Sequence, residues 1–386
     1  MVKAIRFHRV GGPEVLSWDD IDLPPLGEED IRVRHTVVGL NFIDTYHRSG
    51  LYPLPLPSGI GMEGAGIVTG VGPGVTSLSL GDRVAYAAPP PGSYAEERNI
   101  NANAVVKIPD SVSDKVAAAL MLKGLTAQYL IRQIHKVGPS DTILIHAAAG
   151  GVGLIVCQWA KRLGATVIGT VGNDEKAALA SDNGCDYPII YTRENFVDRV
   201  LEITNGHKLP VVYDSVGKDT FENSLKSVST CGHIINFGQS SGPIDPVQMS
   251  LLATKSLTIS RPIIFDYISE RETLIKMAQS VFNAFNVLLF EFINQDQKPV
   301  NISGSTITFH LISQDGATSL LKKDLVALNS TYGRAKLTLT EEELDIIEEQ
   351  PANWSLERSS GNLNEAVFVD DYSGGRGTAE IGRAHV

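Results

Sequence analysis

The sequence predicts an α/β protein in three parts: a β-rich domain over residues 1–115, a doubly wound parallel sheet over 116–286, and a β-rich segment over 297–386. Three observations support this fold class. Gly and Pro separate short strand-like runs such as "IRVRHTVVGL" and "GDRVAY" in the first part. From residue 142, apolar strand runs alternate with helical patterns, as in a sheet covered on both faces. Alternating runs and polar turns return near residue 297.

The elements of the middle part follow from apolar periodicity. "SDKVAAALMLKGLTAQYLIRQI" predicts a helix over 113–134, with Ser113 as N-cap. Six strand runs follow: "TILIHA", "TVIGTV", "YPIIY", "PVVYDSV", "GHIINFG" and "SLTISRP". Six parallel strands are the number found in a dinucleotide-binding sheet. "SERETLIKMAQSVFNAF" predicts the helix that ends this part.

Composition and charge argue against several classes of protein. The chain has 386 residues and a formal net charge of -11, so we expect neither nucleic acid nor an anionic membrane surface as partner. No apolar run reaches the roughly 20 residues of a membrane span. The first residues lack the apolar core of a signal peptide, which favours the cytoplasm. Three distant cysteines, and nine histidines without ligand spacing, predict no disulfide framework and no metal site.

A glycine turn lies between the first strand of the sheet and the next helix, in "HAAAGGVGL". Gly150, Gly151 and Gly153 allow a tight turn and close approach of a pyrophosphate, which the N–H groups at the helix N-terminus attract. The alternative is a helix start that packs on the sheet and binds nothing. The strand–turn–helix frame favours a dinucleotide.

The end of the second strand indicates which dinucleotide. An NAD site carries an acidic residue there, whereas this strand continues as "VGNDEK", with Gly172 and Asn173 at its tip. Lys176 is placed to meet a 2′-phosphate, and Tyr191 to stack or hydrogen-bond beside it. This pattern favours NADP over NAD. For Lys176, the alternative is an ordinary exposed helix lysine.

Several motifs together resemble one family. They are "GGPEVL", "VGLNFIDTYHRSGLYP", "PSGIGMEGAGIVTGVGPGV", "LKGLTAQYL", "HAAAGGVGLIVCQWAKRLGA", "VVYDSVG" and "FGQSSG", which span residues 1 to about 285. The chain resembles the quinone oxidoreductase (zeta-crystallin-like) branch of the medium-chain dehydrogenase/reductase superfamily, and among its members the bacterial NADPH:quinone reductases. The resemblance implies a GroES-like β domain, a Rossmann domain, an active-site cleft between them, and a homodimer.

The resemblance also indicates whether the chain carries the zinc ligands of its superfamily. Zinc-dependent members carry "GHE" where this chain has "GME", so Met62 replaces the histidine ligand. Gly39 stands in place of their cysteine ligand, and a thioether is a poor Zn²⁺ ligand beside imidazole or thiolate. We therefore expect a zinc-free reductase. Without a Lewis acid, the acceptor must already be electrophilic, such as a quinone or an α,β-unsaturated carbonyl.

The resemblance implies roles for individual residues. Asn41, Tyr46, Tyr52 and Thr126 are its catalytic candidates; the two phenols face the substrate and can hydrogen-bond a quinone oxygen. For each tyrosine the alternative is a half-buried loop aromatic. The expected cofactor-binding residues are Asn41, Phe42, Ile43, Asp44, Thr45, Thr126, Tyr129, Gly150, Gly151, Val152, Gly172, Asn173, Lys176, Tyr191, Val216, Phe237, Gly238, Gln239, Ser240 and Arg261.

Two charged residues carry open alternatives. Lys123 lies either beside the cofactor or at an exposed helix position. Glu63, within a predicted glycine-rich turn, is expected to be structural because no proton relay is visible around it; the alternative is an acid/base role.

The resemblance ends near residue 287. The strand-and-turn pattern beyond it resembles β-sandwich modules of phage tail or baseplate proteins. Either the chain is a natural fusion, or its reading frame joins two unrelated genes; the absence of the family's closing segment favours the second. NADPH-dependent quinone reduction is the leading function. The alternatives are reduction of unsaturated carbonyls, NADPH or RNA binding without catalysis, and a particle-associated role for the tail.

Overall fold

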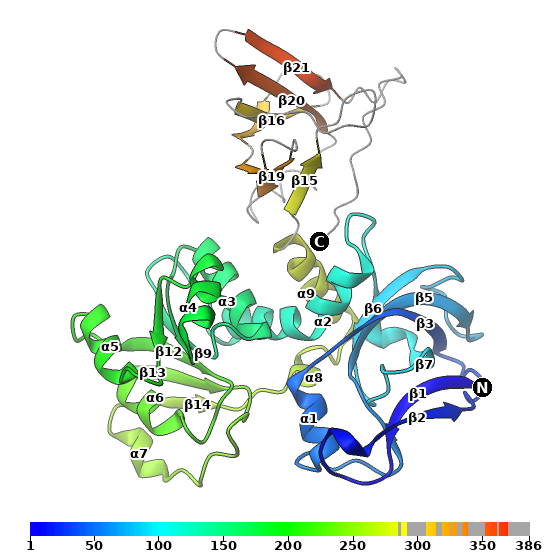
Figure 1. Ribbon diagram of the computed structural model, residues 1–386, viewed down its shortest axis with the longest axis horizontal. Coiled ribbons are helices and arrows are strands. Elements are labelled where there is room, and N and C mark those ends of the chain that lie inside the picture. Colours follow the sequence, from blue (N-terminus) through cyan, green and yellow to red (C-terminus); the bar gives the residue numbers. More distant parts are fainter. Residues whose placement is uncertain are drawn as a thin grey trace. The chain divides into compact units, whose positions relative to one another are not determined.

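The computed structural model describes residues 1–284 and, beyond them, the backbone of the strands between Val287 and Val369 (Figure 1). The chain forms two compact units. The first contains residues 1–108 and 114–281, and the second contains 109–113 and 282–386. Within the first unit we call residues 1–108 the β part and residues 142–261 the parallel-sheet part.

A five-stranded antiparallel sheet forms the frame of the β part. Its order is β7 (Glu97–Asn101), β3 (Asp30–Gly39), β5 (Glu63–Val71), β6 (Arg83–Ala87) and β8 (Val105–Lys107). Successive side chains of a strand point to opposite faces, so Ile31 and Val33 of β3 enter the core while Arg34 is exposed. A second sheet joins β2 (Leu16–Ile21), β1 (Val2–Phe7) and β4 (Ser58–Gly59). The short helices η1 (Pro13–Val15) and η2 (Ala102–Ala104) connect strands.

The helix α1 (Phe42–Ser49) begins two residues after β3 ends. The Asn41 N–H donates to Asp44 Oδ2 at 2.9 Å, which satisfies one of the free amides at the helix start. The helix ends at Gly50, whose φ of 82° is a left-handed conformation that glycine adopts without strain. Tyr46 and, just beyond the helix, Tyr52 are therefore held close to the carboxyl end of β3.

The helix α2 (Asp114–Gln128) continues into the π-helical segment η3 (Tyr129–Ile134). It is rich in small residues because it is packed on several sides. Met121 and Leu125 are fully buried. A Cβ on Gly124 would lie 2.5 Å from Cγ1 of Val281, on α9 (Arg271–Ala284), so the close packing of these helices requires glycine. The sequence predicted one helix here; the structure adds the change of helix type at Tyr129.

Six parallel strands form the sheet of the parallel-sheet part, in the order β11 (Tyr187–Ile190), β10 (Thr166–Val171), β9 (Thr142–His146), β12 (Leu209–Asp214), β13 (Val228–Asn236) and β14 (Thr258–Ser260). This is the doubly wound dinucleotide-binding order, which confirms the predicted fold class. The helices α3 (Gly151–Arg162), α4 (Asp174–Asp182), α5 (Phe196–Ile203) and α6 (Phe221–Ser227) connect the strands. Ile143, Leu144 and Ile145 of β9 are fully buried, as expected for a strand covered on both faces.

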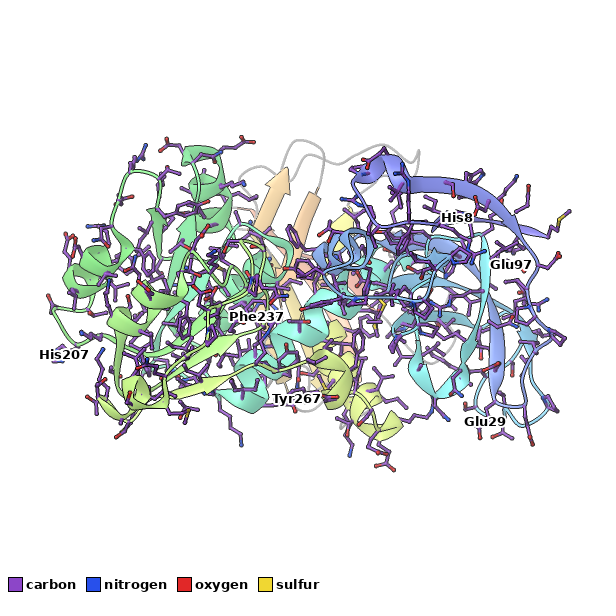
Figure 2. The ribbon with its side chains drawn as sticks, turned by 90° about the horizontal axis from the view of Figure 1, so that it is seen from below. His8, Glu29, Glu97, His207, Phe237 and Tyr267 are labelled. Atoms are coloured by element: carbon purple, nitrogen blue, oxygen red, sulfur yellow. The ribbon has the colours of Figure 1, made fainter. Side chains whose placement is uncertain are left out.

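The short helices α7 (Met249–Ala253) and α8 (Ile264–Tyr267) flank β14. In the view of Figure 2, His207 lies at the outer end of the parallel-sheet part, and Phe237 lies on the side nearer the β part. Phe237 directly follows β13, so the carboxyl end of this strand is directed toward the β part. Among residues 1–284, no helix is long and apolar enough to cross a membrane.

The second unit is rich in antiparallel strands, as the sequence predicts. One sheet has the order β15 (Val287–Glu291), β19 (Arg334–Thr338) and β18 (Val326–Asn329). The other has the order β17 (Ser319–Asp324), β16 (Thr306–Ser313), β20 (Ala352–Ser360) and β21 (Leu363–Val369). The boundaries that the sequence predicts at residues 286 and 297 lie outside the described residues.

Candidate active site

The glycine turn follows β9 directly. Ala147 has a φ of 55°, and the Gly150 N–H donates to the Ala147 carbonyl at 2.8 Å, which closes the turn. No side chain caps the N-terminus of α3 in the described part of the chain. A Cβ on Gly153 would lie 2.3 Å from the Ala147 carbonyl oxygen, so only glycine lets the helix approach the turn this closely. The first N–H groups of α3, those of Gly151 and Val152, have no acceptor within the helix, and a helix start of this kind attracts an anion. Gly150, Gly151 and Val152 remain predicted pyrophosphate ligands.

A cavity of about 590 Å³ opens beside this turn. It brings together predicted residues that follow five strands, β9 to β13: Gly150, Gly172, Lys176, Tyr191, Val216 and Ser240. A Cβ on Gly172 would lie 3.2 Å from the Tyr191 hydroxyl, so the phenol lies directly over this glycine. The Asn173 side chain makes a contact within its own helix. Its oxygen accepts from the Lys176 N–H at 2.9 Å and so caps the N-terminus of α4.

The charges around the cavity favour an anion. Within residues 1–284, the Lys176 ammonium has no ion pair or hydrogen bond partner. Asp174 is engaged elsewhere, since Arg193 donates to both its oxygens, at 2.6 and 2.9 Å. Glu194 accepts from the Ile190 N–H and pairs with Arg199. The lysine is therefore available to pair with a phosphate, while Asp174 and Glu194 are each paired with an arginine. Asp219 also lines the cavity.

Sequence reasoning missed two buried polar residues at strand ends, His146, which lines this cavity, and Asp214. The His146 ring, 1% exposed, contacts Thr170 Oγ1 and Ser224 Oγ, each at 2.9 Å, and so ties β9 to β10 and α6. Burial lowers the pKa of this imidazole. Asp214 accepts from the N–H groups of Val216 and Gly217 and so shapes the loop after β12. Both are polar residues at the ends of buried strands, and this position is the sequence feature that could have identified them.

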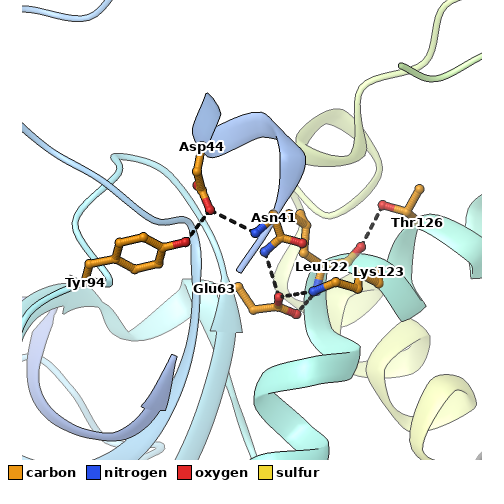
Figure 3. Close-up of polar contacts among 7 residues, drawn as sticks. All are labelled: Asn41, Asp44, Glu63, Tyr94, Leu122, Lys123 and Thr126. Atoms are coloured by element: carbon orange, nitrogen blue, oxygen red, sulfur yellow. Dashed lines mark hydrogen bonds and ion pairs between the residues drawn. The ribbon is translucent and has the colours of Figure 1, made fainter. Parts of the chain in front are cut away.

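A fully buried carboxylate lies at the other end of the site, between β5 and α2 (Figure 3). Glu63 accepts from Asn41 Nδ2 at 2.8 Å, from the Leu122 N–H at 2.6 Å, and from Lys123 Nζ at 3.1 Å. Burial raises the pKa of Glu63, and the Lys123 ammonium opposes this shift. Sequence reasoning placed Glu63 in a glycine-rich turn. The structure corrects this, because Glu63 is the first residue of β5.

The Lys123 side chain is 22% exposed, so it does not occupy the exposed helix position that was the alternative for it. Its carbon chain lies over the pyrophosphate turn, since a Cβ on Gly151 would be 2.7 Å from Lys123 Cδ. Thr126, one turn further along α2, donates its hydroxyl to the Leu122 carbonyl at 2.7 Å. The helix therefore connects the buried carboxylate with the turn of α3.

The remaining predicted residues of α1 differ in their surroundings. Asp44 is 4% exposed, and its Oδ2 accepts from Asn41 N and the Tyr94 hydroxyl. Burial raises the pKa of Asp44. Ile43 is partly buried, and Thr45 donates to the Phe42 carbonyl. Phe42 is 58% exposed, with its ring against Tyr46.

Two phenols of the β part reach the parallel-sheet part. The Gln239 N–H donates to the Tyr46 hydroxyl oxygen at 3.2 Å, and Arg261 Nη2 donates to the Tyr52 hydroxyl oxygen at 3.1 Å. The two tyrosine rings are 5.1 Å apart between centroids. Phe237, Gly238 and Ser240 are on the same segment after β13 as Gln239. Tyr129, by contrast, is 2% exposed and stacks on Tyr267, at the core side of η3.

The residues at the positions of the zinc ligands do not fit zinc. Met62 is 2% exposed and offers only a thioether. A Cβ on Gly39 would lie 2.1 Å from Glu63 Oε2, so the carboxylate takes the space in which a cysteine side chain would begin. Within residues 1–284, no group of three His, Cys, Asp or Glu side chains is arranged to hold a metal.

A GroES-like β part, a six-stranded parallel sheet with a glycine turn, and a site between them define a medium-chain dehydrogenase/reductase. Two family models agree: the alcohol dehydrogenase GroES-like domain matches residues 27–139, and the zinc-binding dehydrogenase domain matches 151–280. A quinone oxidoreductase of Pseudomonas aeruginosa is 51% identical over 284 residues, which is 73% of this chain and 87% of that protein. The chain therefore belongs to the quinone oxidoreductase family, in the zinc-free branch of that superfamily.

Two further comparisons bear on substrate and cofactor. The quinone oxidoreductase of Escherichia coli, solved in complex with NADPH, is 47% identical with a TM-score of 0.72, over 74% of this chain and 88% of that one. A 2-haloacrylate reductase of Burkholderia is 44% identical over 74% of this chain and 88% of that protein.

Proposed function

We propose that the chain reduces quinones by hydride transfer from NADPH, without a metal ion. The observation that carries the proposal is the Lys176 ammonium, which has no ion-pair partner among residues 1–284 and lines the same cavity as Gly150, Gly172 and Tyr191. This arrangement fits a dinucleotide whose pyrophosphate meets the start of α3 and whose additional phosphate meets Lys176. The NADPH complex of the Escherichia coli relative supports the same cofactor.

The bound dinucleotide would supply the hydride, and the protein would bind and orient the reactants. Asn41, Thr126 and Val216 are proposed beside the nicotinamide, where Glu63 holds the Asn41 amide in one orientation. Phe237 to Ser240 would contact the cofactor, and the phenols of Tyr46 and Tyr52 would form the acceptor side. The hydroxyls would hydrogen-bond the acceptor oxygen as negative charge develops on it.

Reduction of α,β-unsaturated carbonyls is the second candidate, and the 2-haloacrylate reductase relative favours it. Both reactions place negative charge on an oxygen conjugated to the carbon or oxygen that receives the hydride. We further propose a cytoplasmic homodimer, which rests on the family resemblance and on the low cysteine content. The predicted site residues all lie in residues 41–261, so the proposal depends on the first unit alone.

The test is a steady-state assay with NADPH and a soluble naphthoquinone, run in parallel with NADH and with 2-chloroacrylate. We expect NADPH oxidation that depends on the quinone and is unchanged by a metal chelator. Faster turnover of 2-chloroacrylate than of any quinone would favour the second candidate. NADPH binding without turnover of either acceptor would contradict both candidates and favour a non-catalytic role. Gel filtration of the same preparation tests the dimer.

A further inference from the structure

We propose that Arg261 and the backbone N–H of Gln239 make Tyr46 and Tyr52 a pair of hydrogen-bond donors for the oxygen of the acceptor, with Arg261 as a positioning residue for Tyr52. This inference rests on the proposed function. It gives Arg261 a role different from the direct cofactor contact that the sequence predicts.

The direction of both hydrogen bonds is determined by chemistry. A guanidinium group and a backbone N–H can only donate. In the Arg261–Tyr52 contact of 3.1 Å and the Gln239–Tyr46 contact of 3.2 Å, the phenol oxygen must therefore accept. Each hydroxyl keeps its own proton for another partner. Within residues 1–284, neither hydroxyl donates a hydrogen bond.

Arg261 is itself held in place. Its Nη1 donates to the Asn236 carbonyl at 3.0 Å, at the carboxyl end of β13, while Nη2 reaches Tyr52. The guanidinium is planar and rigid, so two contacts orient it. The carboxyl ends of parallel strands are where ligands bind in such sheets, and this end carries both the Asn236 anchor and the Phe237–Ser240 segment.

The two phenols form one local structure. Their ring centroids are 5.1 Å apart at 60°, and the Tyr52 N–H donates to the Tyr46 carbonyl at 3.1 Å. The two hydroxyls therefore come from the end of α1 and the residues directly after it, while their hydrogen-bond donors come from two segments of the parallel-sheet part. A hydroxyl that accepts from a cation or an amide is polarised and becomes a stronger donor.

This geometry points to a substrate class. Two adjacent donors suit an oxygen that becomes negative during the reaction, as in an oxyanion hole. Addition of a hydride to a quinone or to an α,β-unsaturated carbonyl compound places two electrons on a conjugated system that ends in such an oxygen. We therefore expect acceptors with a conjugated carbonyl or carboxylate oxygen. The phenols stabilise the charge and need not transfer a proton.

The test is a double-mutant cycle of Arg261→Met and Tyr52→Phe in the full chain, with Arg34→Met as control. Arg34 is exposed on β3 and has no part in the site. We expect Arg261→Met to lower kcat and kcat/KM for a quinone equally, by about tenfold, with NADPH affinity within about twofold of wild type. In the Tyr52→Phe background, the same substitution should cost less than about twofold, because the hydroxyl through which it acts is absent.

The outcomes distinguish a failure of the positioning role of Arg261 from a failure of the proposed function. An equal loss in both backgrounds, or a large fall in NADPH affinity caused by Arg261→Met alone, would overturn the positioning role and support direct cofactor binding. A rise in KM with unchanged kcat would also count against it, because the contact would then act on ground-state binding. A wild-type chain inactive with both acceptor classes would refute the proposed function itself, and this inference with it.

Discussion

Lys123 Nζ lies 3.1 Å from Oε2 of Glu63, a carboxylate with no exposed surface that also accepts from Asn41 and the Leu122 amide. This pair joins the first residue of β5 to α2, and the lysine carbon chain lies over Gly151 at the start of α3. A charge pair thus links the β part to the glycine turn before α3.

The first prediction concerns this pair. Glu63→Gln keeps a similar shape and one acceptor but removes the negative charge, leaving the half-buried ammonium without its counter-ion. We expect the free energy of unfolding to fall by about 1–3 kcal/mol, measured by urea denaturation.

The matched control for Glu63→Gln is Asp82→Asn. Asp82 pairs with Lys107 at 2.9 Å, where the lysine is 56% exposed. Exposed pairs contribute about 0–1 kcal/mol, so this variant should lose less. Equal losses in the two variants would show that burial of the Glu63 pair has no special effect on stability.

The second prediction concerns pH. Burial lowers the pKa of His35 from 6.5 to about 4, while its ring contacts the Ala95 carbonyl and the Tyr86 hydroxyl. The folded protein therefore binds this proton less tightly than the unfolded chain does. Its contribution to stability is complete above pH 6.5 and is lost as pH falls from 6.5 toward 4. The full change is about 3 kcal/mol.

Measurement of unfolding free energy against pH tests this prediction. His35→Gln should flatten the curve between pH 6.5 and 4, whatever its effect on absolute stability. His207→Gln, at an exposed turn, should leave the slope unchanged. If the slope survived in His35→Gln, other groups such as the buried His146 would have to cause it.

The third prediction concerns cofactor choice. Lys176→Ala removes the unpaired ammonium of the cavity. We expect the Kd for NADPH to rise by about 10–100-fold, the size of a lost charged hydrogen bond, while the Kd for NADH stays the same. Fluorescence titration with both cofactors measures this. Lys276→Ala, at an exposed position on α9, should alter neither Kd. Parallel loss of both cofactors would place Lys176 away from the 2′-phosphate.

The fourth prediction concerns the glycine turn. In Gly153→Ala, the new Cβ would lie 2.3 and 2.7 Å from the backbone carbonyl oxygens of Ala147 and Ala148. Backbone atoms cannot move aside easily, so α3 must shift away from the turn. We expect at least about tenfold weaker NADPH binding and a loss of roughly 1–3 kcal/mol of stability.

Gly138→Ala is the control for Gly153→Ala, because a Cβ there meets nothing within 4 Å. It should bind NADPH like the wild type and unfold at the same or a slightly higher denaturant concentration. Normal NADPH binding by Gly153→Ala would show that the turn tolerates a side chain and would weaken its assignment as a pyrophosphate site.

Local patterns were sufficient for much of the fold. The alternation of apolar strands and helices predicted the six-stranded sheet, and the glycine turn falls where strand β9 meets α3. Lys176, after the second strand of the sheet, and Tyr191, after the third, were predicted to lie beside each other, and both line the cavity. These predictions succeed because β-strand and helix periods, and the need for glycine in a tight turn, are properties of short segments.

Other features depend on distant segments. Nothing near Glu63 in the sequence indicated that Asn41 and Lys123 would contact it, 22 and 60 residues away. Nothing in the sequence indicated that Asn173 would cap α4 or that the Tyr129 ring would stack on Tyr267; their predicted cofactor contacts stay predictions. In each case, a side chain's partner is chosen by packing between elements.

The sequence by itself determined the order of strands and helices, the position of the glycine turn, and the lack of zinc ligands at Gly39 and Met62. Only the tertiary structure decided that Arg261 meets Tyr52 across 209 residues and that Glu63 holds Lys123. The physical reason is the separation along the chain over which each feature is determined. Backbone conformation follows from neighbours along the chain, whereas hydrogen bonds between side chains depend on which surfaces the folded chain brings within about 3 Å of each other.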